Sequence, residues 1–393
     1  MESLSLESKV YKSIQEVSRE EWDLINSTGD IFHTYTFLKD IEDAKVENST
    51  FWYMMIYNEK KLIATAVLSA FIINLDIFIP TGAFIRGVRK IWPGFLKIKI
   101  LMCGIPASLG QKNIVIADMQ YKNQVIKIVS DEMNKISKEG KIKYMAFKEF
   151  KENEIADYDH LKHNGYFKAL SLPYMRIKVK WGDFESYLSD LRHGYKRQIL
   201  NSLKKINLTG GFQLRNILNG SDSKVPCLIL ADSTVCTPEL FYKSYLEVMN
   251  RAVSKLETLN FDFFKNYFES HKEKLIFIVL AEDQTIYGSA ILVPHESELT
   301  FALIGKHGEK DKYDTYFNLI TAIVKYGIEN NFETINMGQT SYYPKQRVGA
   351  KPENEYIYFR SGKIMMHTVL RLLNKVLFPE TKIQNVNVFK NTN

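Results

Sequence analysis

The chain has 393 residues, of which 45% are hydrophobic and 13% aromatic, so it is long enough for two cores of ordinary size. This composition indicates a globular protein, and three scattered cysteines (Cys103, Cys227 and Cys236) argue against a disulfide framework or a zinc site. The net charge of +7 suits an anionic partner, such as a CoA moiety, RNA or a lipid headgroup, but many proteins with no such partner are as basic.

Two observations bear on the location of the protein. The N-terminal segment has no charged region followed by an apolar stretch, so we expect no signal peptide. The longest apolar stretch, 62–73, is too short to span a membrane and is expected to form a buried pair of strands. A cytoplasmic protein is therefore expected.

The first half of the chain is predicted to alternate helices and strands. We expect short helices at 18–26 and 35–44, a hairpin at 53–71, a helix at 123–138 and a strand at 142–147. Residues 76–110 contain three prolines and five glycines, which predicts a loop-rich insertion. Its basic and aromatic residues could embrace a polyanion, or could simply form a solvated loop.

The second half shows a similar order of elements. A continuous helical pattern at 184–207 is followed by expected helices at 237–255 and 261–272, a hairpin at 275–294, a strand at 299–306, a helix at 313–330 and a strand at 334–337. A strand at 356–359 and an amphipathic helix at 364–377 close the chain.

The two halves are related by a repeat. Residues 277–292 align without a gap on 53–68, at an offset of 224 positions, and 319–337 align on 129–147 at an offset of 190. Because a repeat this long implies similar domains rather than a solenoid, we expect a domain at 1–170 and a second at 171–393. The difference between the offsets corresponds to the insertion at 76–110.

This order of helices, hairpin, strand, helix and strand resembles the GNAT acyltransferase fold. Two such units in tandem resemble the FemABX-like branch, and the stretches FESYLSDLRHGYKRQI (184–199) and 313–350 resemble BioF2-like, or CelD-type, acyltransferases. The resemblance implies an α+β fold of two tandem GNAT-like domains with mixed central sheets. It also implies an enzyme that moves an acyl group onto an amine.

The resemblance implies a donor site at the start of the helix 313–330, where unpaired N–H groups favour an anion. The candidates for donor binding are Gly305, Lys306, Lys310, Lys312 and Tyr316. The stretch 305–318 nevertheless lacks the Q/R-x-x-G-x-G/A turn with which typical GNAT domains hold the CoA pyrophosphate. Acyl-CoA is the expected co-substrate, but an acyl carrier protein or an aminoacyl-tRNA is an open alternative, and the lysines could equally be solvated.

Acyl transfer to an amine needs a proton acceptor and groups that hold the acceptor molecule. His307 and Tyr342 are the catalytic candidates. Gln339, Lys345 and Arg347, which follow the strand 334–337, are candidates for acceptor binding, as are Arg192 and Lys196 in the basic helix. A plain turn and a solvated helix face are the competing interpretations.

Two other classes of function stay open. A FemX-like aminoacyl-tRNA-dependent ligase would use the basic insertion, although no long heptad run predicts a coiled-coil arm. A non-enzymatic RNA-binding module would be expected to carry an aromatic RNA-binding strand motif, which is lacking. No metal site and no permanently bound cofactor are expected. The helix 364–377 is expected in a core; alternatively it lies on the inner membrane, which would suit a lipid amine rather than a small-molecule acceptor.

Overall fold

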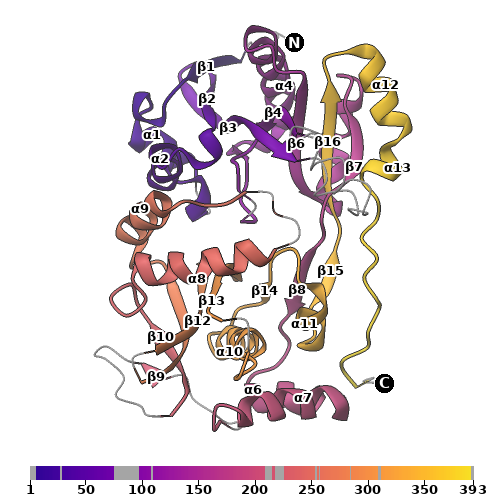
Figure 1. The fold of residues 1–393 in the computed structure, drawn as a ribbon. Helices are drawn as coiled ribbons and strands as arrows, with labels where there is room; N and C mark the ends of the chain where they lie inside the picture. Colours follow the sequence, from indigo (N-terminus) through magenta and orange to yellow (C-terminus); the bar gives the residue numbers. More distant parts are fainter. Residues whose placement is uncertain are drawn as a thin grey trace, which may run out of the picture. The chain divides into compact units, whose positions relative to one another are not determined.

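The computed structural model describes residues 6–26, 29–74, 97–107, 109–208, 215–216, 225–252, 255, 257–283, 285–308 and 311–390. The chain forms two compact units (Figure 1). Unit 1 comprises Met1–Leu172, Ser254–Leu259 and Asn354–Thr381, and unit 2 comprises Pro173–Val253, Asn260–Glu353 and Lys382–Asn393.

Unit 1 is built on one mixed sheet with the strand order β1-β2-β3-β4-β6-β16-β7, and β5 pairs with β3. Its elements are β1 (Glu7–Tyr11), α1 (Arg19–Ile25), α2 (Tyr35–Asp43), β2 (Thr50–Asn58), β3 (Lys61–Asn74), β4 (Lys97–Cys103), β5 (Ile114–Ile116), α4 (Lys122–Glu139), β6 (Tyr144–Lys151), α5 (Ile155–Tyr158), β7 (Phe167–Leu170), β16 (Glu355–Ser361), α12 (Ile364–Leu372) and α13 (Asn374–Leu377). The apolar side of α4 packs on one face of the sheet in a core that includes Val125, Val129 and Met133.

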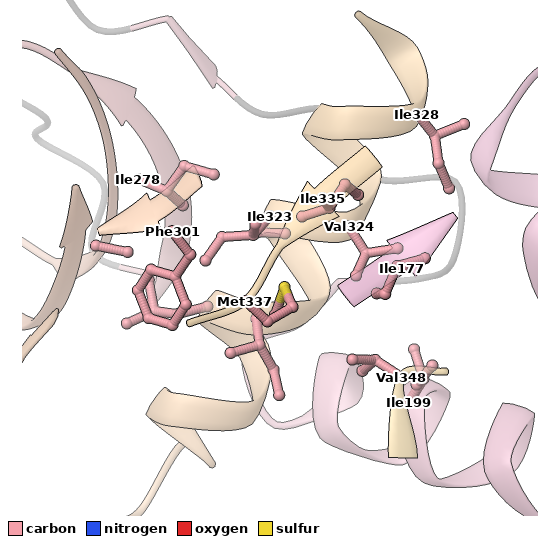
Figure 2. Packing of buried hydrophobic residues seen from close by; sticks show 14 of the residues in the cluster. Ile177, Ile199, Ile278, Phe301, Ile323, Val324, Ile328, Ile335, Met337 and Val348 are labelled. Atoms are coloured by element: carbon pink, nitrogen blue, oxygen red, sulfur yellow. The ribbon is translucent and has the colours of Figure 1, made fainter. Parts of the chain in front are cut away.

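Unit 2 is built on a second mixed sheet, in the order β15-β8-β14-β13-β12-β11-β10-β9. Its elements are β8 (Tyr174–Lys178), α6 (Phe184–Asp190), α7 (His193–Lys204), β9 (Arg215–Asn216), β10 (Cys227–Ala231), α8 (Pro238–Arg251), α9 (Phe261–His271), β11 (Ile276–Glu282), β12 (Thr285–His295), β13 (Glu298–Lys306), α10 (Thr315–Glu329), β14 (Thr334–Asn336), α11 (Tyr342–Arg347) and β15 (Lys351–Glu353). Figure 2 shows part of its core, in which Ile323 of α10, Phe301 of β13 and Met337 are buried together.

The predicted repeat is confirmed in element type and in fine detail. The hairpin β2–β3 and the hairpin β11–β12 correspond at the offset of 224, and each contains one β-bulge. The bulge lies between Ile56 and Tyr57 in the first hairpin and between Leu280 and Ala281 in the second, which are equivalent positions. In each unit the strand after the hairpin also runs parallel to the strand that follows the long helix, as β4 with β6 and as β13 with β14.

Several sequence expectations need correction, and three of them concern the domains, the insertion and the helix at 184–207. The predicted C-terminal domain, 171–393, does not form one unit, because β16 pairs between β6 and β7 and so returns Asn354–Thr381 to unit 1. The insertion 76–110 is not all loop, since it supplies the central strand β4; residues 75–96 and 108 lie outside the described ranges. The helix expected at 184–207 is two helices, because Leu191 and Arg192 have extended backbones.

No helix in the part of the chain that the structure describes is long and apolar enough to cross a membrane.

Candidate functional site

Unit 2 contains a place where two neighbouring strands separate. The parallel ladder between β13 and β14 consists of three residue pairs and ends at Thr300 and Asn336, whereas β13 continues to Lys306. Beyond Asn336 the chain turns toward β8: the Met337 N–H donates to the carbonyl of Met175, and the Met175 N–H donates to that of Gly338. The separation leaves backbone groups of β13 without a β14 partner, and a backbone N–H in such a place can donate to the oxygen of a reacting carbonyl.

The lysine Lys345 lies at this separation. Its Nζ donates to the carbonyl oxygens of Gln339, at 2.7 Å, and Gly338, at 3.4 Å. A Cβ added to Gly338 would lie 4.0 Å from the same nitrogen. The side chain is buried, and burial lowers the pKa of Lys345 to about 7. An amine with this pKa is partly uncharged at neutral pH and can accept a proton.

The short helix α11 places this lysine. The preceding Thr340 and Ser341 have positive φ angles of 60° and 46°, so the chain reverses sharply after β14. A plain turn was one interpretation of this segment, but Tyr342–Arg347 form a helix, and Pro344 is its third residue, which needs no intrahelical N–H bond.

Arg347 joins α11 to two other helices. Its Nε donates to Oε1 of Gln198 in α7 at 2.5 Å, and its guanidinium lies 5.1 Å from the ring centre of Phe317 in α10 and 5.3 Å from that of Tyr343. The structure therefore gives Arg347 a local positioning role, and its role in acceptor binding stays a prediction.

Of the other residues predicted to bind the acceptor or to act in catalysis, some lie close to Lys345 and some do not. Gln339 and Tyr342 lie on the same turn and helix as Lys345, and Tyr342 is half-buried against the core of unit 2. Tyr316 also reaches this region: its hydroxyl is hydrogen-bonded to the side chain of Ser341, and burial raises its pKa. Lys196 lies two residues before Gln198 on α7, whereas Arg192 caps that helix, and its Nε donates to the carbonyl of Phe389 at 3.1 Å.

The residues predicted to bind the donor have partners inside the protein. Nζ of Lys306 forms an ion pair with Asp311 at 3.1 Å, and Lys312 lies over the ring of Tyr313, with Nζ 4.5 Å from its centre. Gly305 has a packing role, because a Cβ there would lie 1.9 Å from Oγ of Ser244 in α8. Lys310 lies outside the described residues.

The predicted anion site at the start of α10 already carries a carboxylate. Oδ1 of Asp311 accepts from the Thr315 N–H at 2.6 Å. Burial opposes the ionisation of Asp311, but this bond and Lys306 together lower its pKa. A donor phosphate placed at this helix end would meet the negative charge of Asp311.

His307, the histidine predicted to act as a base, is held by a glutamate. Its Nδ1 lies 2.7 Å from Oε1 of Glu247 in α8, and the hydrogen bond to His307 lowers the pKa of Glu247. Glu247 is 60 positions away in the sequence, and no local pattern pointed to it. Asp311 was missed as well, because the N-cap position of α10 is held by Asp314 and Asp311 lies outside it.

No group of three or more His, Cys, Asp or Glu side chains that could hold a metal ion is found within the described ranges.

The topology and the strand separation define a tandem GNAT-like protein of the α+β class. The chain belongs to the FemAB-like family, described as peptidoglycan biosynthesis/recognition, whose model matches residues 13–347. No curated protein matches the chain in sequence.

Solved structures match the chain at low sequence identity, and the first two below share its fold. A structure of FemX matches with a TM-score of 0.55 and 10% identity, over 93% of this chain and 100% of that one. The C-terminal domain of a putative lysylphosphatidylglycerol synthetase from Agrobacterium fabrum matches with a TM-score of 0.51 and 13% identity, over 93% and 97% of the two chains. A tandem GNAT protein from the clavulanic acid biosynthesis pathway matches with a TM-score of 0.47 and 8% identity, over 91% and 99%.

Proposed function

We propose that unit 2 transfers an activated acyl group to an amine, at the point where β13 and β14 separate. The observation that carries this proposal is the buried amine of Lys345, whose pKa is about 7. In its neutral form this amine has two N–H groups, which its two carbonyl partners can accept, and a lone pair that stays available for a proton.

The proposed reaction consists of attack by the amine, transfer of its proton and loss of the carrier. The acceptor amine attacks the donor carbonyl carbon, and its excess proton passes to the lone pair of Lys345. Backbone N–H groups of β13 stabilise the oxyanion. The carbon–sulfur or carbon–oxygen bond to the carrier breaks, protonated Lys345 returns the proton to the leaving thiolate or alkoxide, and an amide remains. Lys345 replaces His307 as the proposed proton acceptor, because Nδ1 of His307 is hydrogen-bonded to Glu247.

The donor is a thioester, from acyl-CoA or an acyl carrier protein, or alternatively the ester of an aminoacyl-tRNA. The placement of Asp311 at the start of α10, paired with Lys306, favours a donor that does not lay a pyrophosphate on that helix. This observation supports the acyl carrier protein and the aminoacyl-tRNA over acyl-CoA.

The acceptor in this proposal is a lipid or small-molecule amine, or the free amine of a peptidoglycan precursor, which the description of the family supports. A cytoplasmic location belongs to the same proposal.

The donor is tested by incubating the purified protein with acyl-CoAs, acyl carrier protein thioesters and aminoacyl-tRNAs, each with a mixture of amine acceptors. Mass spectrometry then identifies any new amide. An amide formed from one donor class supports the proposal and names the donor. Absence of an amide with all three classes, at protein concentrations that exceed those of the donors, contradicts acyl transfer.

A further inference from the structure

The helices α12 and α13 expose apolar side chains that were expected in a core. Met365 and Leu372 are 82% and 76% exposed, and Val376 is 63% exposed. Met365, Val369 and Leu372 follow the spacing i, i+4, i+7, so they form one stripe along α12. Single exposed apolar residues are ordinary, but seven in the 13-residue stretch 364–376 form a patch. Its members are Ile364, Met365, Met366, Val369, Leu372, Leu373 and Val376.

The opposite side of these helices is anchored to the sheet of unit 1, beside β7 and β16 (Figure 1). Leu370 and Leu377 pack against a buried cluster that includes Phe378. Nδ2 of Asn374 donates to the carbonyl of Lys168 at 2.9 Å, and the ring of His367 lies 5.6 Å from that of Phe167. The anchoring contacts leave the apolar stripe pointing away from the core of unit 1.

The charged residues of the segment 363–379 are all basic. Lys363, Arg371 and Lys375 are exposed, and the sequence has no Asp or Glu from 363 to 379. A symmetric contact with a second copy would bring these cations together, and the segment offers no acid to compensate them. An anionic lipid surface instead accepts the apolar side chains and attracts the cations.

We propose that α12 and α13 form a lipid-docking surface, by which unit 1 binds reversibly to an anionic bilayer. The apolar side chains enter the boundary between headgroups and acyl chains, while the three basic side chains meet the lipid phosphates. This surface is independent of the strand separation in unit 2, and the proposal does not rest on acyl transfer.

The test is flotation of the full-length protein with vesicles. We expect binding to vesicles of phosphatidylcholine with 30% phosphatidylglycerol, and weak binding to phosphatidylcholine alone. The triple variant Met365→Ser, Leu372→Ser, Val376→Ser should lose binding, whereas Leu24→Ser, which removes an 83% exposed leucine elsewhere in unit 1, should retain it. Replacing Lys363, Arg371 and Lys375 by glutamine should weaken binding about fivefold for each residue.

A second comparison controls for net charge. Lys127→Gln with Lys135→Gln removes two exposed cations from α4, and this variant should bind like the wild type. Thermal melting of each variant verifies that it is folded. No binding of the wild type to anionic vesicles, or equal binding by the triple serine variant, overturns the proposal. So does a dimer, detected by sedimentation, that the triple serine variant converts to a monomer.

Discussion

In both units the parallel ladder stops after a few residue pairs, but the space beyond its end is filled differently. In unit 1 the ladder between β4 and β6 ends at Cys103 and Phe147, and the next residue, Lys148, is buried in the gap. Its Nζ donates to the carbonyl of Ala107 at 2.6 Å, while Nδ2 of Asn113 donates to the carbonyl of Lys148 at 3.2 Å. The gap in unit 1 is therefore occupied by the protein's own hydrogen-bonded side chains.

In unit 2 the position equivalent to Lys148 is Gly338, at the offset of 190. A glycine places no side chain in the gap, and the lysine amine near it comes from α11 instead. The comparison teaches that a buried lysine alone does not mark a site. What distinguishes Lys345 is that it lies beside Gly338, which follows β14 and places no side chain in the gap.

The largest expected effect is a difference in transfer rate between variants of Lys345 and Lys148. Lys345→Met removes the proposed proton acceptor while keeping a similar volume, so the rate of acyl transfer should fall about a thousandfold. Lys148→Met, the matched change in unit 1, should leave the rate within threefold of the wild type. The measurement is the initial rate of amide formation with whichever donor class gives an amide in the assay proposed above. Equal losses in the two variants would show that the gaps do not differ in function.

The pH dependence of stability sharpens the assignment of Lys345. Burial holds its folded-state pKa near 7, below the ordinary value of 10.5, so the unfolded chain binds one more proton between these values. This lysine should therefore lower the free energy of unfolding by about 4 kcal/mol as the pH falls from 10.5 to 7, with no further loss below about 7.

Lys345→Met carries no titrating group, so the difference in stability between the wild type and this variant isolates the effect. Urea denaturation at several pH values should show that the free energy of unfolding of the variant rises relative to that of the wild type as the pH falls from 10.5 to 7. A difference that is independent of pH would mean that Lys345 stays protonated in the folded protein.

The repeat made much of the fold predictable. The hairpins and the long helices α4 and α10 have continuous apolar patterns in the sequence. Residues that align between the two halves lie at equivalent positions of the two units, and this includes the bulges after Ile56 and Leu280. The position of β16 could not be predicted, because the hydrogen bonds of β16 to β6 and β7 join segments about 200 residues apart and leave no periodic pattern in the sequence.

The candidate site was predictable only as a region. The polar segment after β14 and Lys345 within it were identified from their place at a strand end. The burial of Lys345 was not foreseen, because it depends on α11 and on the absence of a side chain at Gly338. The partners of the predicted donor lysines were missed for a similar reason: ion pairs such as Lys306–Asp311 depend on a loop conformation that composition does not define.

Glycine substitutions test how full each gap is. A Cβ at Gly104 in unit 1 would lie 2.8 Å from Oδ1 of Asn113, at a φ of +139°, so Gly104→Ala should cost about 3 kcal/mol. A Cβ at Gly338 would meet nothing closer than 3.5 Å, at a φ of +70°, so Gly338→Ala should cost only the left-handed strain of about 1 kcal/mol. Urea denaturation measures both losses, and a larger loss for Gly338→Ala would contradict the difference in filling.

The smallest effect is expected at His307. Its Nδ1 is occupied by Glu247, which is itself more than a third exposed, so the pair should contribute less than about 1 kcal/mol to stability. His307→Gln should therefore shift the melting temperature slightly and change the transfer rate less than threefold, because the proton passes to Lys345. A loss of rate comparable to that of Lys345→Met would instead make His307 the proton acceptor. Retention of the wild-type pH–rate profile in His307→Gln, with loss of that profile in Lys345→Met, would separate the two residues.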